Sequence, residues 1–392
     1  MRTTLTNLQG LRGWACVIVF FTHLANWESV FGISRPLLWW VPYFGLGSVD
    51  IFFVLSGFVI AHTQYELRGK PKRLGEFLFR RGWRVFPPYW LMLCVGIVLM
   101  VTRLGWPPAT TSDWVGWLTL LPTTTKFTFL PPAWTLAYEL AFYVIFAILV
   151  LLPKRVGTVV LLLWAGAVGW ATLTQQTEIL GTWSLAFLTP HAWELLLGCT
   201  VAWWVRRGRV PHGGWCLLAG LVWAATWWLI FGCYRGPHGL GAQPSLRVLT
   251  YGPMGALFVL GFVELERRGV TPFPTWLKEI GEGSYSIYLL HAPIGMAIFD
   301  LTLRWWPHDN LRHFAWLLTM TTACLGGGYL FHRYIERPVV KFGQRKKFRK
   351  PTAPIVVEAI IQADCRVGNA DSVGTAGSVS TNRVGPSSAR SY

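Results

Sequence analysis

Long apolar stretches recur along this chain from residue 8 to residue 334. Each stretch is close to twenty residues long, the length that an α-helix needs to cross about 30 Å of hydrocarbon. The pattern predicts an all-α, polytopic membrane protein with about ten transmembrane helices. The predicted spans are residues 9–27, 46–62, 86–102, 133–152, 156–173, 184–204, 214–232, 248–265, 282–302 and 313–333.

The composition agrees with this pattern. Hydrophobic residues make up 53% of the chain and charged residues 14%, against about 25% charged residues in an ordinary soluble domain. The net charge of +17 raises the question of a nucleic-acid partner. If the N-terminus is cytoplasmic, 25 Lys and Arg residues fall in segments on the cytoplasmic side and seven on the other side. This asymmetry predicts that both termini are cytoplasmic, and it explains the charge without nucleic acid.

The domain organisation is simple. Residues 1–345 are predicted to form one transmembrane domain. Residues 346–392 begin with a basic run and then change to Ser, Gly, Thr, Val and Asn without helical periodicity, which predicts a disordered cytoplasmic tail. The seven cysteines contain no C-x-x-C pair, so neither a disulfide framework nor a metal site is predicted.

Ionisable side chains inside the spans are costly in a bilayer and indicate pairing or function. Arg12 and His23 are eleven residues apart, on nearly the same face of the first helix and about 16 Å apart along its axis. His23, Asp50 and Glu139 lie about 6–10 Å below the outer ends of their spans at about 1.5 Å per residue. We therefore expect these three to meet. A histidine beside carboxylates is typical of a general base, and a proton relay is the alternative.

Arginines are concentrated just before the third predicted span. Arg80, Arg81 and Arg84 precede Pro87 and Pro88, where prolines are expected to set the entry of the helix. Arg81 and Arg84 share a helix face if this segment is helical. Such a pair suits the bidentate binding of a phosphate group. The alternative is a contact with lipid headgroups.

Four further polar residues are candidates on the acceptor side. Glu194 and His191 lie in the sixth span, where they form either a substrate-binding pair or a hydrogen bond between helices. Tyr288 and His291 lie in the ninth span, where packing is the alternative to substrate binding.

At these residues the chain resembles the acyltransferase 3 family of membrane acyltransferases. Six motifs carry the resemblance in order over residues 5–340: NLQGLRG at 7–13 followed by His23, GSVDIFFVLSGF at 47–58, RGWR at 81–84, WTLAYE at 134–139, SYSIYLLH at 284–291 and IERP at 335–338. The resemblance implies an O-acyltransferase that takes an acyl group, most simply acetyl, from cytoplasmic acyl-CoA. The acceptor would be a hydroxyl of a cell-surface polysaccharide or of its lipid-linked precursor, and a small-molecule hydroxyl is the alternative acceptor.

The resemblance also implies roles for the residues. His23 would be the catalytic base or would carry the acyl group, supported by Glu139 and Asp50, while Arg12, Arg81 and Arg84 would bind the donor. Gln9 stands where many relatives have Asp, and this variation resembles the exopolysaccharide-modifying branch. The implied location is the bacterial inner membrane, and proteins of polysaccharide assembly are implied as partners.

Two other classes of function remain. In a proton-coupled transporter or flippase of glycan or lipid precursors, the intramembrane carboxylates and His23 would relay protons without any bond being made. Transporters often contain repeated halves and helices broken within the membrane, and neither is evident in this sequence. A purely structural membrane scaffold does not explain several polar residues at one depth.

Overall fold

The computed structural model describes residues 5–30, 37–38, 41–176, 181–208, 212–232, 243–303 and 310–344. Within these residues all regular secondary structure is helical, and no strand is present. The fold class predicted from the hydrophobic pattern is therefore confirmed. The tail predicted over residues 346–392 lies outside the described residues.

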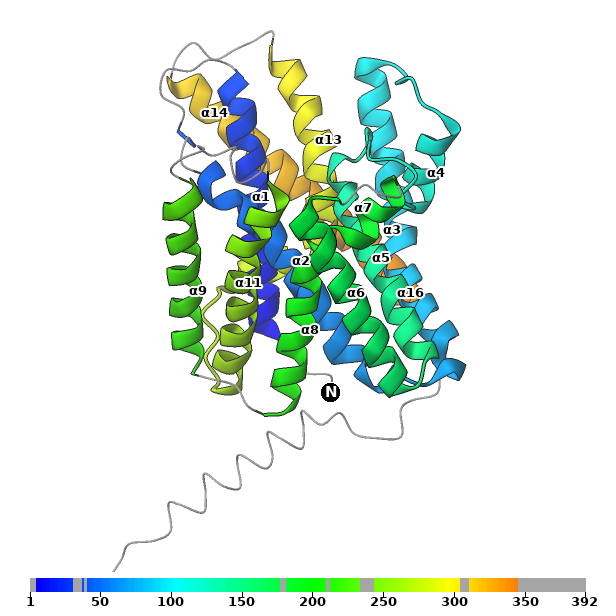
Figure 1. Ribbon diagram of the computed structural model, residues 1–392. Helices are drawn as coiled ribbons and strands as arrows, with labels where there is room; N and C mark the ends of the chain where they lie inside the picture. The colour runs from blue at the N-terminus through cyan, green and yellow to red at the C-terminus, as the bar shows by residue number, and fades with distance from the viewer. Residues whose placement is uncertain are drawn as a thin grey trace, which may run out of the picture. The chain divides into compact units, whose positions relative to one another are not determined.

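The long helices run side by side and roughly along one direction (Figure 1). Their bounds are α1 Thr6–Val30, α2 Pro42–Gln64, α3 Leu74–Leu104, α5 Trp134–Leu151, α6 Lys154–Thr174, α8 Ala192–Arg206, α9 Gly213–Trp227, α11 Pro244–Arg267, α13 Ser284–Leu303 and α14 Asn310–Thr321. Shorter helices are α4 Thr111–Thr119, α7 Thr182–Leu188, α12 Thr275–Glu282, α15 Gly327–Phe331 and α16 Arg337–Gln344. Three π-helical turns are η4 Trp228–Gly232, η5 Thr322–Gly326 and η6 His332–Glu336.

Nine segments of the described residues are long and apolar enough to cross a membrane. Each of them overlaps one of the predicted spans, so the chain is a multi-pass integral membrane protein. The remaining predicted span, residues 282–302, corresponds to α13, which is 20 residues long but is not among the nine. Its first half carries Ser284, Tyr285, Tyr288 and His291, and these polar side chains face the interior described below.

The predicted start of the third helix at residue 86 is wrong. Helix α3 begins at Leu74 and continues through Pro87 and Pro88 to Leu104. The prolines remove two backbone donors inside the helix, and in the same region the Tyr285 hydroxyl donates to the Val85 carbonyl at 3.0 Å. Arg80, Arg81 and Arg84 therefore lie within α3 and not in a loop before it.

The predicted span 184–204 is also interrupted. Helix α7 ends at Leu188 and α8 begins at Ala192. Pro190 cannot donate a backbone hydrogen bond, and Thr189 before it has the extended conformation that a following proline favours, with φ −57° and ψ 141°. A broken helix is thus present although none was evident in the sequence, and the break places His191 at the start of α8.

Helix α2 lies at the centre of the packing, against α1, α8 and α11. Its closest neighbour is α8, because glycines face each other across the contact. A side chain at Gly57 would collide with the backbone of Leu195, and one at Gly198 would collide with the backbone of Val54. Gly57 and Gly198 therefore permit the close approach of α2 and α8.

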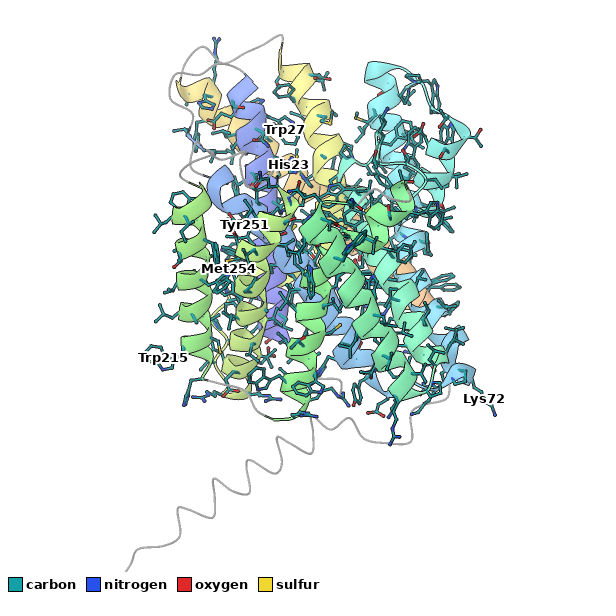
Figure 2. The ribbon with its side chains drawn as sticks, in the orientation of Figure 1. His23, Trp27, Lys72, Trp215, Tyr251 and Met254 are labelled. Atoms are coloured by element: carbon teal, nitrogen blue, oxygen red, sulfur yellow. The ribbon has the colours of Figure 1, made fainter. Side chains whose placement is uncertain are left out.

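The basic segments gather at one end of the bundle, which we call the basic end. Arg206 pairs with Glu66 at 3.0 Å, and Arg267 donates to the Val205 carbonyl at 2.9 Å. In Figure 2 Lys72 lies at this end, whereas His23 and Trp27 lie in the opposite half.

Helix α1 starts at the basic end. Its first free amides, those of Thr6 and Asn7, donate to the Glu266 carboxylate at 2.6 and 2.8 Å. A carboxylate at this position satisfies backbone donors that have no partner within the helix. Arg12 is therefore about 9 Å from the start of α1 and His23 about 25 Å from it, at about 1.5 Å per residue.

Candidate functional site

A cavity of about 120 Å³ lies between helices α1, α2, α3, α5 and α13. Its wall combines apolar and polar side chains. The apolar ones are Val49, Phe52, Phe53, Val85 and Leu136, and the polar ones are Arg12, Ser56, Arg84, Thr135, Glu139, Tyr143, Ser284, Tyr285 and Tyr288. Five helices thus converge on one polar space inside a membrane protein.

Two arginines supply the positive charge on this wall. Arg12 comes from α1 and Arg84 from α3. Their mutual repulsion is opposed by two carboxylates, because Glu139 and Glu336 both attract Arg12, and Arg84 attracts Glu336. Guanidinium groups that are held near each other in this way can bind an anionic oxygen from two sides.

Arg81 lies outside the lining of the cavity. Its guanidinium donates to the Thr63 hydroxyl at 3.3 Å and lies 5.7 Å from the centre of the Tyr143 ring. The Tyr143 hydroxyl in turn donates to Glu139 at 2.6 Å. Arg81 therefore reaches the cavity through Tyr143, whereas Arg12 and Arg84 face it directly.

His23 faces another imidazole. The centres of the His23 and His291 rings are 5.0 Å apart, and the Trp27 ring is 6.2 Å from His23. Neither Asp50 nor Glu139 forms an ion pair or hydrogen bond with His23 in the part of the chain that the structure describes. The expected pairing of His23 with a carboxylate is not found.

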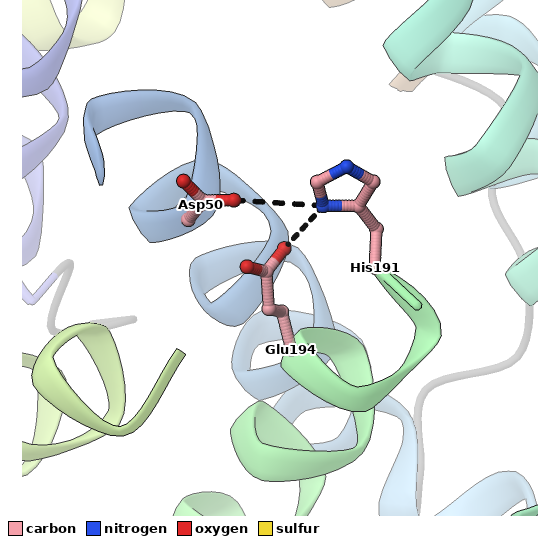
Figure 3. Close-up of side chains that lie close together, drawn as sticks. All are labelled: Asp50, His191 and Glu194. Carbon is pink, nitrogen blue, oxygen red and sulfur yellow. Dashed lines mark hydrogen bonds and ion pairs between the residues drawn. The ribbon is translucent and has the colours of Figure 1, made fainter. Parts of the chain in front are cut away.

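Asp50 is fully buried and lies close to His191 and Glu194 (Figure 3). Arg247 completes this separate cluster around Asp50. The Arg247 guanidinium donates through Nε to both Asp50 oxygens, at 2.9 and 3.1 Å. His191 Nδ1 lies 3.5 Å from Asp50 Oδ1 and 3.0 Å from Glu194 Oε2. The cluster joins α2, the start of α8 and the first turns of α11.

Three members of this cluster have the geometry to share a metal ion. Asp50, His191 and Glu194 each offer a ligand atom within 4.8 Å of the others, and no second such group occurs among the described residues. However, the Asp50 carboxylate is already paired with the Arg247 guanidinium. Where water is excluded, the positive charge of Arg247 would repel a metal ion bound to the same carboxylate. His191 Nδ1 already contacts Glu194 Oε2 at 3.0 Å, and both Asp50 oxygens accept from Arg247. These contacts among the residues themselves disfavour a metal ion at this place.

Tyr288 connects the separate groups. Its side chain lines the cavity together with that of Thr135, and its ring lies 6.0 Å from that of His291. Tyr285, Tyr288 and His291 are spaced three residues apart on α13, so they follow one side of the helix. One helix face thus leads from the arginine-lined cavity to the pair of histidines.

Three buried residues were missed by the sequence reasoning. Arg247 was counted among the loop charges, but it is only 8% exposed and pairs with Asp50, because α11 begins at Pro244. Glu336 accepts hydrogen bonds from Ser286 at 2.7 Å and from His332 at 2.8 Å. The i, i+4 spacing of His332 and Glu336 was the available signal.

The third missed residue is Glu28, at the end of α1 that is opposite the basic end. Its carboxylate accepts from the amides of Leu37 and Leu38 at 2.8 and 3.0 Å, and it pairs with His313 at 2.8 Å. Glu28 is fully buried. It ties the segment after α1 to α14, and its position near a span boundary gave no sign of burial.

Residues 5–333 match the family described as the acyltransferase domain. The chain belongs to this acyltransferase family. The relation predicted from six motifs is thus confirmed, and it extends over nearly the whole membrane domain. It makes the protein an acyltransferase rather than a transporter or a scaffold.

Three curated proteins show how far the similarity reaches. The exopolysaccharide production protein ExoZ of Rhizobium meliloti (strain 1021) is 27% identical over 325 residues, 77% of this chain and 92% of the relative. Acyltransferase MdmB of Streptomyces mycarofaciens is 25% identical over 390 residues, 91% of this chain and 97% of the relative. Nodulation protein 10 of Rhizobium leguminosarum bv. viciae is 25% identical over 345 residues, 76% of this chain and 86% of the relative. No solved structure matches the chain.

Proposed function

We propose that this protein is an acyl-CoA-dependent O-acyltransferase that modifies a hydroxyl of a cell-surface polysaccharide or of its lipid-linked precursor. The observation that carries the proposal is the cavity with Arg12 and Arg84 on its wall, joined by Tyr288 to the histidine pair. The acceptor class is suggested by the relative that is named for exopolysaccharide production.

The proposed donor enters from the basic end, which the charge pattern assigns to the cytoplasm. Arg12 and Arg84 would bind its phosphates, because guanidinium groups match phosphate oxygens in geometry and charge. Along α1, His23 is about 16 Å beyond Arg12, so an extended pantetheine arm would bring the thioester toward it.

His23 is proposed as the general base. It would take the proton of the acceptor hydroxyl while the oxygen attacks the thioester carbonyl carbon. The new C–O bond replaces the C–S bond, and the CoA thiolate leaves and receives the proton from His23. An acyl-imidazole on His23 is the second route, in which the ring nitrogen attacks first.

The main claim is tested with purified protein, acetyl-CoA labelled in the acetyl group, and glycans of the host surface. We expect label to move to a glycan hydroxyl and to be released by mild base, as an ester is. The control is that the same folded protein transfers an acyl group from another kind of donor. If it does so but never transfers label from acetyl-CoA to any hydroxyl acceptor, acyl-CoA is not the donor.

Direct attack and the acyl-imidazole route are distinguished by a single-turnover experiment with labelled acetyl-CoA and no acceptor, in which label on the protein is measured. Direct attack predicts that no label stays on the protein. If wild-type protein retained the acetyl label and the His23→Ala variant did not, the acyl-imidazole route would be correct and direct attack would be wrong.

The donor site makes a specific kinetic prediction. Replacing Arg84 by leucine should raise KM for acetyl-CoA about tenfold to a hundredfold, because a hydrogen bond to a charged group is worth about 1.5–3 kcal/mol. With S-acetylpantetheine, which has no phosphate, the same change should have little effect. Initial rates with both donors measure the difference.

Arg80→Leu is the matched control for this experiment. Arg80 is on the same helix, is exposed, and pairs with Glu76 at 3.0 Å on the basic side of the site. Its loss should leave KM for both donors within about twofold. An equal rise in KM for both donors in Arg84→Leu would exclude phosphate recognition by Arg84.

The proposed location is the inner membrane of a bacterium, with the lipid bilayer as the surroundings of the site. Proteins of polysaccharide assembly are the proposed partners, since they would deliver the lipid-linked acceptor to the half of the bundle that contains His23.

A further inference from the structure

The pair formed by His23 and His291 contains a ring nitrogen, Nε2 of His291, that has no role in the proposed reaction. His291 lies on α13 opposite α1, and its ring is packed against His23 and Phe20, with ring centres 5.0 and 6.4 Å away. His291 is 1% exposed. The backbone carbonyl of His291 accepts a hydrogen bond from the Cys324 thiol at 3.5 Å, so its position relative to η5 is also defined.

The tautomer of His291 follows from its neighbours. Nδ1 lies 2.7 Å from the Tyr288 carbonyl oxygen and 3.3 Å from the Ile287 carbonyl oxygen. A carbonyl oxygen can only accept, so Nδ1 must carry the hydrogen. In the neutral ring Nε2 then has a lone pair and no hydrogen.

This Nε2 atom is buried and has no hydrogen-bond partner among the described residues. A buried acceptor without a donor is unfavourable, because water satisfied it before the protein folded. Such an atom in a packed interior indicates a donor that arrives or turns toward it. The ring that faces it is His23.

The distance between the rings fits this donor. A hydrogen bond between two ring nitrogens spans about 2.9 Å, and each nitrogen is about 1 Å from the centre of its ring, so bonded imidazoles have centres about 5 Å apart. The observed separation is 5.0 Å. The terminal torsion of a histidine side chain has a broad minimum, so a small rotation of the His23 ring aligns the bond.

We propose that His291 is a positioning residue for His23, with Nε2 of His291 accepting a hydrogen bond from one ring nitrogen of His23. The other nitrogen of His23 is then left without a hydrogen and turned toward the substrates. This inference rests on the proposed function, in which His23 is the base. It assigns to His291 the task that a carboxylate performs in a Ser-His-Asp triad.

A neutral imidazole suits this place in a membrane protein. A carboxylate beside His23 would need its own counter-ion inside the bilayer, as Asp50 needs Arg247. His291 instead fixes the tautomer of His23 without adding a buried charge. The expected carboxylate partner of His23 is thus replaced by a group of the same hydrogen-bonding function.

Two substitutions at His291 separate positioning from other roles. In His291→Gln the amide oxygen reaches the place of Nε2 and can still accept from His23. In His291→Asn the side chain is too short for that, although it can still donate to the Tyr288 carbonyl. If His291 positions His23, Asn should lower kcat about a hundredfold, Gln should lower it by less than about tenfold, and KM for acetyl-CoA should change little in both.

The spectroscopic readout does not depend on turnover. The chain has nine histidines, so ¹⁵N-histidine NMR spectra are tractable, and the His23→Ala spectrum assigns the signals of His23. We expect one tautomer of His23 in the wild type and in His291→Gln, and a mixture of tautomers in His291→Asn. An unchanged His23 tautomer in His291→Asn would overturn the proposal.

The outcomes also distinguish this proposal from the proposed function. If His23→Ala kept full transfer, the role of His23 as the base would be wrong, and the positioning role would be wrong with it. If His23→Ala abolished transfer while the Gln and Asn variants of His291 behaved alike, only the positioning role would be wrong. A rise in KM for the acceptor in both variants would instead identify His291 as a substrate-binding residue.

Discussion

Replacing His23 by alanine is expected to lower the rate of acyl transfer about 10²- to 10⁴-fold, which is the usual contribution of a positioned general base. The effect should appear in kcat, with KM for acetyl-CoA nearly unchanged, because the donor-binding Arg12 is about 16 Å from His23 along α1. The imidazole is partly buried and faces the rings of Trp27 and His291, so alanine removes the reactive group without leaving a buried charge unpaired. Transfer of labelled acetyl groups to glycan measures the rate.

His212→Ala serves as the control for this prediction. His212 is exposed and lies just before α9, so its loss should change neither folding nor activity. Both variants must elute as monodisperse protein and unfold at the wild-type temperature. Wild-type activity in a folded His23→Ala variant would show that the reaction does not use His23.

Replacing Arg247 by methionine is expected to have the largest effect on stability. Methionine keeps an unbranched apolar side chain that ends near the position of Arg247 Nε, but it leaves the Asp50 carboxylate buried without its cation. Breaking a buried ion pair in this way typically costs about 3–5 kcal/mol. We expect the midpoint of thermal unfolding in detergent to fall by about 10 °C or more.

A double variant tests the reason for this loss. Asp50→Asn combined with Arg247→Met removes both charges, and stability should largely return, because a neutral pair needs no counter-ion. Arg155→Met, at an exposed position, should have no effect. If the double variant were as unstable as Arg247→Met alone, the loss would come from packing and not from the unpaired charge.

The same double variant also addresses the catalytic role predicted for Asp50. Asp50 lies in the cluster with Arg247, His191 and Glu194 and not beside His23. If stability returned together with full acyl transfer, Asp50 would hold α2 and α11 together and would take no part in the reaction. If stability returned and transfer did not, the predicted role in the reaction would stand.

Much of the fold could be predicted because a membrane imposes strong rules on sequence. Within hydrocarbon the backbone must satisfy its own hydrogen bonds, so an apolar stretch of the right length has to be a helix. The predictions failed where a local rule from soluble proteins was applied. Pro87 and Pro88 were expected to begin α3 but lie inside it, because prolines are tolerated within membrane helices where neighbouring helices can satisfy the backbone groups left free.

The site was predicted in its parts but not in its pairing. Arg12, Arg84, Glu139 and Tyr288 do line one cavity, and His191 with Glu194 do form a pair. Equal depth suggested that His23 would meet a carboxylate, yet His291 faces it. The depth of a residue in the bundle does not determine its partner, because side chains at the same depth can point toward different neighbouring helices.

By itself, the sequence determined that this is a helical membrane protein, which end of the bundle is basic, and which acyltransferase family it belongs to. These properties depend on composition and on order along the chain. Only the tertiary structure decided that Asp50 pairs with Arg247, 197 residues away, and that His23 faces His291. Such pairs depend on how each helix is rotated about its axis, and close packing between helices sets that rotation, as at Gly57 and Gly198.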